Sequence, residues 1–217
     1  MSPGLQEDNA SSDPLRSESD ERMSADWRNR LIVGITGASG AILGVRLLEA
    51  CRALRLEVHL CVSKAAELTL SYELEMRAAD LKALVHRAYA PGDVGAAIAS
   101  GSFRTRGMIV APCSIRTMSE IACGTTMSTL TRAADVVLKE QRKLVLLLRE
   151  TPLHAGHLEN LLKLARMGAI IAPPVPAFYI KPQSVDALVD HTVGRALDLL
   201  DLDSDLPHRW REVENQG

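Results

Sequence analysis

The chain has 217 residues, of which 47% are hydrophobic, so its length and composition suit one globular domain with a full-sized core. A formal net charge of −2 and a pI of about 6.3 exclude the strongly basic surface that draws proteins to nucleic acid or anionic membranes. No apolar run approaches the roughly 20 residues of a transmembrane helix. We therefore expect a soluble protein with neither nucleic acid nor a membrane as a partner.

The two ends of the chain differ in composition from its middle. Residues 1–26 carry seven acids and two bases among Ser, Pro, Gly and Asn, a composition that buries too little apolar surface to fold. They lack the apolar core of a secretory signal, and their acids argue against a transit peptide. We expect a disordered acidic tail at 1–28, one α/β domain at 29–202, and a C-terminal tail at 203–217.

From residue 30 onward, short apolar or β-branched runs alternate with longer amphipathic stretches. This alternation is the pattern of βα units around a parallel sheet. The expected strands are 31–35, 57–62, 107–111, 143–148 and 169–172. Helical patterns lie between them at 41–54, 65–72 and 153–167. The sequence therefore predicts an α/β domain.

Each expected strand ends in a polar or punctuated segment, in chain order GITGASG, VSKAA, APCSIRT, RETPL and PPVPAFY. Right-handed crossovers place all five ends on the same edge of the sheet. A single Ser after a strand is more often a helix N-cap than a ligand contact. Five such segments together, with hydroxyls, backbone amides and an Arg, predict an anion pocket at helix N-termini.

The first of these segments has the glycine spacing GxxGxxG, which is neither the dinucleotide fingerprint nor a Walker A motif. The second strand ends in Ser63, where a dinucleotide enzyme usually places an acid for the ribose. A mononucleotide is therefore favoured over NAD. The side chains that could donate hydroxyl hydrogen bonds to its phosphate or ribityl chain are Ser39, Ser63, Ser114 and Thr117.

Arg149 and Glu150 follow the expected strand 143–148 directly, which is where open α/β sheets carry their chemistry. Glu150 could act as a general acid/base if the fold buries it, with Arg149 holding a phosphate. Alternatively, Glu150 begins the next helix, where the helix dipole stabilises an acid. Sequence position alone leaves both interpretations open.

The helical stretch before this strand carries two cations seven residues apart, Arg132 and Lys139. Because seven residues are about two helical turns, their side chains should project in nearly the same direction, with Glu140 pointing elsewhere. The same spacing is typical of a solvated helix face. The pair is therefore either a phosphate clamp or an ordinary surface.

The cysteines and histidines indicate no metal site. The four cysteines show no CxxC spacing and lie in apolar segments, which favours reduced core thiols and a cytosolic location. His154 and His157 have no third ligand placed to join them. Cys113 follows a strand without a His to activate it, so a packed thiol is expected rather than a nucleophile.

Several motifs in order, GITGASG, VSKAA, APCSIRT, RAADVVLKE, LVLLLRETPL, PPVPAFY and GRALDLL, resemble the UbiX-like flavin prenyltransferases over roughly residues 31–200. The resemblance implies a flavodoxin-like or Rossmann-like three-layer sandwich that binds FMN and assembles as a homododecamer, with sites built partly across subunit boundaries. Enzymes of this family join the dimethylallyl group of dimethylallyl phosphate to N5 and C6 of reduced FMN, without a metal. The product, prenylated FMN, serves UbiD-type decarboxylases.

The resemblance also assigns roles to residues. Glu150 would move protons, and Ser39 and Lys139 would assist catalysis. Four residues, Lys139 among them, would bind dimethylallyl phosphate: Arg132, Lys139, Tyr179 and Arg195. The residues that would contact the flavin nucleotide are Gly37, Ala38, Ser39, Ser63, Ser114, Ile115, Arg116, Thr117 and Arg149.

The chain departs from the family pattern in two places. The segment 124–129 reads GTTMST where an aromatic or acidic, Asn-containing turn is expected, and Arg116 stands where Lys is common.

Two other functions fit the same fold. A cysteinyl decarboxylase would need an early catalytic His and a PASANT-like motif, which the chain lacks. A non-catalytic FMN-binding subunit of a hydroxyarylic acid decarboxylase would not need Lys139, Glu150, Tyr179 and Arg195 together.

Overall fold

The computed structural model describes residues 26–93 and 95–206. Within these ranges the chain forms a six-stranded, all-parallel sheet in the order β3-β2-β1-β4-β5-β6. The strands are β1 (Arg30–Ile35), β2 (Glu57–Val62), β3 (Arg87–Tyr89), β4 (Gly107–Cys113), β5 (Lys143–Leu148) and β6 (Ala169–Ile171). The expected α/β sandwich is confirmed, and the order is that of doubly wound nucleotide-binding sheets.

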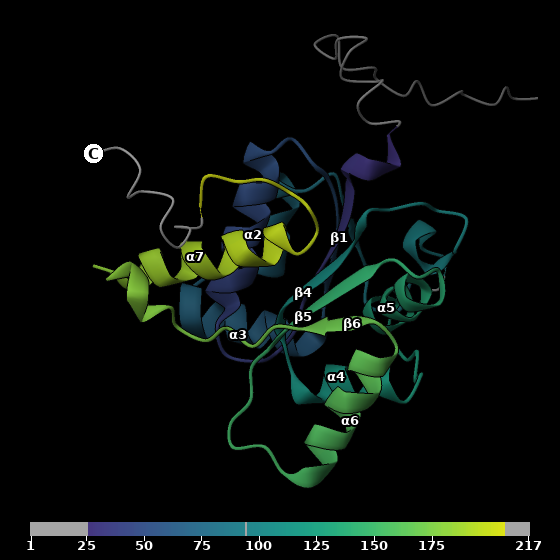
Figure 1. The fold of residues 1–217 in the computed structure, drawn as a ribbon. Coiled ribbons are helices and arrows are strands. Elements are labelled where there is room, and N and C mark those ends of the chain that lie inside the picture. Colours follow the sequence, from purple (N-terminus) through teal and green to yellow (C-terminus); the bar gives the residue numbers. More distant parts are fainter. Residues whose placement is uncertain (1–25, 94, 207–217) are drawn as a thin grey trace, which may run out of the picture.

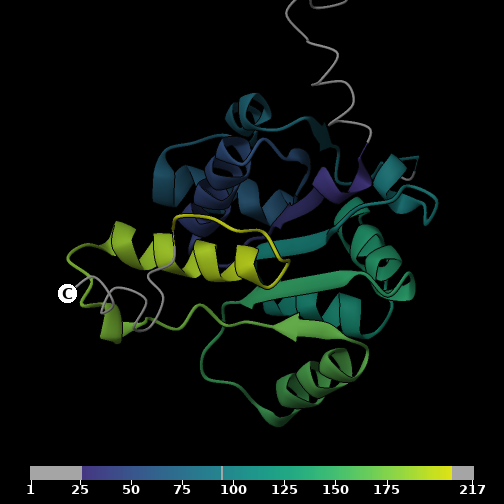
Figure 2. The ribbon, with the colours of Figure 1, turned by 45° about the horizontal axis from the view of Figure 1, so that its top comes forward.

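Helices cover both faces of the sheet, which makes three layers (Figures 1 and 2). One face carries α2 (Ala41–Ala53), α3 (Lys64–Leu74) and α7 (Val185–Asp198), with α2 packed against both of the others. The other face carries α4 (Ile115–Ala122), α5 (Thr129–Lys139) and α6 (Ala155–Arg166). The short 3-10 helices are η1 (Trp27–Asn29), η2 (Ala78–Leu84), η3 (Ala97–Ala99) and η4 (Phe178–Ile180).

The strands are apolar because both faces are buried, as in other parallel sheets. Alternate residues of β1 divide between two cores: Leu31 and Val33 pack with α2 and α7, whereas Ile32 packs with α4 and α5. Two clusters of fully buried aliphatic side chains therefore hold the layers on the sheet. This rigid support leaves the loops at the strand ends to form sites.

The sequence located five strands and missed one. The strand β3 has only three residues, two of them exposed, so no apolar run marks it. Residues 149–152 do not begin a helix as expected, because α6 starts at Ala155 with His154 as its N-cap. The segment after β5 is therefore a loop, and Glu150 does not lie in a first helical turn.

The expected orientation of Glu140 is wrong. It forms an ion pair with Lys139 at the end of α5 instead of pointing away from it. The cysteine prediction holds for Cys51, Cys61 and Cys113, which are buried free thiols, whereas Cys123 is exposed.

Candidate functional site

The candidate site begins where β1 and β4 separate, at the point where the strand order changes direction. Ligands in open α/β sheets bind in the crevice outside the carboxyl ends of such strands. Thr36 joins the two strand ends: its hydroxyl donates to the Pro112 carbonyl at 2.7 Å and accepts from the Ser114 amide at 2.8 Å. This buried side chain fixes the spacing of the loops that follow β1 and β4.

A cavity of about 580 Å³ opens at this edge of the sheet. Its volume lies in the range of about 300–1,000 Å³ that is typical of cofactor and small-ligand sites. Four loops form it, those after β1, β4, β5 and β6. The lining residues are Gly37, Ala38, Ser39, Ser114, Ile115, Arg116, Leu148, Arg149, Glu150, Thr151, Pro173, Pro174, Val175 and Pro176.

The loop after β1 lies against the start of α3 without room for a side chain. A Cβ added at Gly37 would lie 2.4 Å from the Cβ of Ala65. Because Gly37 has none, the backbone of the loop approaches α3 closely and leaves the cavity open to a ligand. Gly40 then adopts a φ of 98° and begins α2.

Two of the expected serines cap helices at the same edge. Ser63 accepts from the Ala66 amide at 3.2 Å, and Ser114 accepts from the Thr117 amide at 3.3 Å. Thr117 is buried behind Ser114, and neither it nor Ser63 lines the cavity. Both hydroxyls are thus occupied as caps in this structure, although Ser114 also faces the cavity.

Arg149 connects the loops after β5 and β1. Its Nε donates to the Ser39 carbonyl at 3.1 Å, which brings a guanidinium beside the glycine-rich loop. Glu150 lies next to it at the cavity wall and accepts from the Thr151 amide at 3.0 Å. Glu150 is exposed, so the chain by itself does not bury it as the acid/base hypothesis requires.

Four of the predicted substrate-binding residues lie outside this cavity. Lys139 ends α5 just before β5 begins, and so lies at the amino edge of the sheet, opposite the cavity. Arg132, on the same helix, pairs with Asp135 at 2.7 Å. Tyr179 in η4 shares a hydrogen bond of 3.0 Å with His191, and Arg195 on α7 pairs with Asp198 at 2.6 Å.

One residue at the site, Glu73, was missed from the sequence. Its carboxylate accepts from the Gly40 amide at 2.9 Å and from the Ala41 amide at 2.8 Å, at the N-terminus of α2. Burial works against ionisation, but hydrogen bonds from Ser39 and these two amides lower the pKa of Glu73 overall. No motif could have identified it, because the contact joins Gly40 and Glu73, which are 33 residues apart in the chain.

Other candidates from the sequence do not form sites. The rings of His154 and His157 stack at 3.5 Å, and no group of three or more His, Cys, Asp or Glu within 26–93 and 95–206 could hold a metal. Burial raises the pKa of the Cys113 thiol to about 12. In the same ranges, no helix has the length and apolar character to cross a membrane.

Comparison with known proteins gives a consistent match over most of the chain. Residues 19–197 match the family model described as Flavoprotein. The flavin prenyltransferase UbiX of Thauera aromatica is 50% identical over 187 residues, which cover 86% of this chain and 96% of that protein.

Two solved structures have the same fold. One, AnUbiX (PadA1) in complex with FMN and dimethylallyl pyrophosphate, has a TM-score of 0.83 and 49% identity, covering 84% of this chain and 97% of that one. The other is a dodecameric FMN-dependent UbiX-like decarboxylase from Escherichia coli O157:H7. It has a TM-score of 0.82 and 51% identity, covering 84% of this chain and 99% of its own.

Proposed function

The chain belongs to the family of UbiX-like flavin prenyltransferases, and we propose that it joins the dimethylallyl group of dimethylallyl phosphate to N5 and C6 of reduced FMN. The observation that carries this proposal is the cavity at the β1/β4 strand ends, where Arg149, Glu150 and the loop at Gly37 converge. The product, prenylated FMN, is a cofactor for UbiD-type decarboxylases.

The cavity fits a flavin nucleotide. The close approach of Gly37 to α3 makes a cradle that any side chain would fill, and Arg149 supplies a fixed cation. We assign flavin contacts to the backbone of Gly37, Ala38 and Ser39. On the β4 side we assign them to Ser114, Ile115 and Arg116, which line the cavity. Ser63 and Thr117 do not line it, and we assign them to the flavin on the family resemblance alone, from their places at the starts of α3 and α4. Reduced FMN supplies the nucleophilic atoms of the reaction.

The protein's own part in the chemistry is to bind the phosphate, exclude water and move protons. A phosphate leaving group is stabilised by fixed cations, and an allylic cation needs a dry pocket. The prolines at 173, 174 and 176 form a stiff wall that serves the second need. Glu150 also lines the cavity, and we assign it to receive the proton lost when the new ring closes and to protonate the departing phosphate.

We infer that Lys139 serves a site on another copy of the chain. Lys143 and Leu148 begin and end β5, about 17 Å apart at 3.3–3.4 Å per residue. A lysine side chain is only a four-carbon stem that ends in an ammonium group. It is much shorter than this span, so Lys139 cannot approach Glu150 of its own chain. We propose a homododecamer in which Lys139, Arg132, Tyr179 and Arg195 complete neighbouring sites.

The activity is tested by mixing the purified protein anaerobically with reduced FMN and either dimethylallyl phosphate or the pyrophosphate. A prenyl mass gain on the flavin is expected, and the two donors are ranked by rate. Flavin that stays bound without a mass gain from either donor refutes the transferase and favours a non-catalytic flavin-binding subunit.

The shared site is tested by subunit complementation. Glu150→Gln and Lys139→Gln are each expected to be inactive alone. If the two residues act from different copies, mixed assemblies contain sites with both native residues, and about a quarter of wild-type activity should return in a random mixture. If verified mixed assemblies stay inactive, the shared site is refuted, whereas the proposed activity of the wild type is not. Mixing wild type with Lys139→Gln is the matched control.

The compartment and domain limits are also proposals. Buried free thiols at Cys51, Cys61 and Cys113 support a reducing, cytosolic setting. The sheet and its helices support one α/β domain at 29–202. The tails expected at 1–28 and 203–217 lie largely outside the described residues.

A further inference from the structure

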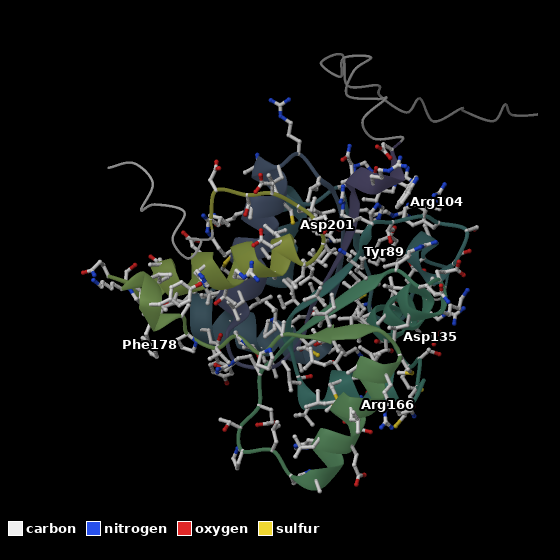
Figure 3. All side chains as sticks on the ribbon, viewed as in Figure 1. Tyr89, Arg104, Asp135, Arg166, Phe178 and Asp201 are labelled. Atoms are coloured by element: carbon white, nitrogen blue, oxygen red, sulfur yellow. The ribbon has the colours of Figure 1, made fainter. Side chains whose placement is uncertain are left out.

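A second cavity, of about 320 Å³, lies at the amino edge of the sheet. Lys143 at the start of β5 lines it, whereas Leu148 at the end of the same strand lines the flavin cavity. The two cavities therefore lie on opposite edges, about 17 Å apart along β5. Figure 3 labels Asp201 and Arg104 on this side of the molecule, away from Phe178.

Two arginines in this cavity are held in place by neutral groups. Arg106 donates from Nε to the Arg28 carbonyl at 2.6 Å and from a terminal nitrogen to the Leu200 carbonyl at 3.1 Å. Arg142 donates to the carbonyls of Phe103 at 2.8 Å and Gly101 at 2.7 Å. Carbonyl oxygens orient a guanidinium but do not neutralise it, and each guanidinium has five N–H donors. Both cations are thus preorganised with donors to spare.

The acids near the cavity offset only part of this charge. Asp201 pairs with Lys143 at 2.5 Å, and Asp26 lies 3.5 Å from Arg28. Glu140 is 4.0 Å from Arg142 but pairs more closely with Lys139. The Arg106 and Arg142 guanidiniums therefore leave the cavity positive, which suits an anionic ligand.

The wall of the cavity includes a residue, Thr105, whose buried hydroxyl has no partner among the described residues. Thr105 is 1% exposed and lines the cavity, and its Oγ1 has no hydrogen-bond partner among the described residues. Buried hydroxyls are nearly always hydrogen-bonded, so such a group calls for an explanation. Because Oγ1 has less than 1 Å² of accessible surface, the side chain must turn about its Cα–Cβ bond to donate to an oxygen of a bound anion. This orphan hydroxyl is independent of the charge and points to the same ligand.

Trp27 also lines the cavity. Its ring contacts the guanidinium of Arg104 at 4.3 Å and that of Arg28 at 4.9 Å, measured to the ring centroid. Cation–π contacts of this kind hold the two cations beside the indole. The indole also provides a fluorophore beside the cavity.

We propose that this amino-edge cavity is a second ligand site that binds a phosphate group, either as inorganic phosphate or as part of a small phosphomonoester. Thr105 and Arg106 come from the loop before β4 and Arg142 from the loop before β5, so donors line the cavity from two segments, as suits an oxyanion with several acceptor oxygens. At about 30 Å³ per water, the cavity has room for about ten waters, more than phosphate alone fills. The site does not depend on the activity proposed above.

The test is calorimetric titration of the full-length, FMN-saturated protein with inorganic phosphate, and in a second arm with glycerol phosphate, at constant ionic strength. Because the proposed prenyl-donor site also accepts phosphate, the decisive quantity is the difference between wild type and Thr105→Val. That variant removes only the hydroxyl and keeps every charge. We expect it to bind phosphate about tenfold more weakly at one site, and to melt no lower than wild type without phosphate, since the lost hydroxyl had no partner.

Ser204→Ala is the matched control, because Ser204 carries another buried hydroxyl without a partner in the described chain but lies outside the cavity. It should bind phosphate like wild type. Lys143→Gln should weaken the same binding event that Thr105→Val weakens. Tighter binding of glycerol phosphate than of phosphate identifies the natural ligand as a phosphomonoester, and the reverse identifies the free ion. Equal phosphate binding by wild type and Thr105→Val overturns the proposal.

Discussion

Replacing Gly37 with alanine tests whether the loop after β1 and the first turn of α3 set the flavin cavity together. The new Cβ would lie 2.4 Å from the Cβ of Ala65, and 3.0 and 3.2 Å from its carbonyl carbon and Cα. Carbon atoms pack at about 3.5–4.0 Å, so the loop and α3 must separate by about 1 Å. Two of the three atoms belong to the helix backbone and cannot rotate away.

The expected cost is that of an overpacked core position, about 1–3 kcal/mol. For a protein of this length, each kcal/mol lowers the melting temperature by about 2–4 °C. FMN affinity should fall by about tenfold or more, because displacing a binding loop by about 1 Å spoils several hydrogen bonds at once. Differential scanning fluorimetry measures the first effect and quenching of flavin fluorescence the second.

A control and a rescue variant isolate the steric cause. Gly92→Ala places its Cβ in open space, with no atom within 4 Å, and should change neither quantity. Adding Ala65→Gly to Gly37→Ala removes the 2.4 Å contact and should restore much of the FMN affinity, despite about 1 kcal/mol lost to helix propensity. If Gly37→Ala melts and binds FMN like Gly92→Ala, the close approach does not shape the cavity.

Three further predictions concern single side chains. Glu150→Gln should keep FMN bound yet lose turnover in the mass assay, whereas an unchanged rate would remove Glu150 from the mechanism. The pKa of Glu73 is lowered from its ordinary value of 4.5, so its bonds to Gly40 and Ala41 contribute stability above pH 4.5 and are lost as the pH falls through the folded-state pKa. Between about pH 5 and 3, the free energy of unfolding should therefore fall less in Glu73→Gln than in wild type. The difference should stay below about 1 kcal/mol because Glu73 is exposed. An equal fall in both proteins would refute this. Iodoacetamide should modify exposed Cys123 and spare buried Cys113 until the protein unfolds, which mass spectrometry of the native protein reads directly.

Much of the fold was predictable because its signals are local. The strands β2 and β5 have the expected limits, since an apolar run bounded by polar residues marks a buried parallel strand. Their carboxyl ends meet at one edge by the handedness of the crossovers, and this is why residues near Gly37, Ser114 and Arg149 line one cavity. The site could thus be located from strand ends alone.

What the sequence did not predict depends on contacts between distant segments. Glu73 reaches the N-terminus of α2 from another helix, and Thr36 links β1 to β4 across 76 residues. Neither pairing has a spacing that a motif could encode. The short strand β3 has too few buried residues to show a period. Residues 149–152 resemble a helix start, yet His154 provides the cap, so the loop that carries Glu150 is longer than expected.

The proposed shared site separates flavin binding from prenyl transfer within the assembly. One chain provides the loops at the carboxyl edge that would enclose the flavin, whereas its own Lys139 lies beyond the far end of β5. A rigid strand that is buried from Leu144 to Leu148 cannot fold back to bring the two together. On the shared-site proposal, flavin affinity is therefore a property of the single chain, and transfer is a property of the interface. Substitutions at Gly37 or Ser39 act in every oligomeric state, whereas those at Lys139 act only where a neighbouring site exists. A variant that weakens the interface without unfolding the subunits would bind flavin but have no activity. A non-catalytic flavin-binding subunit would behave in the same way. The complementation experiment is therefore more informative than any single inactive variant.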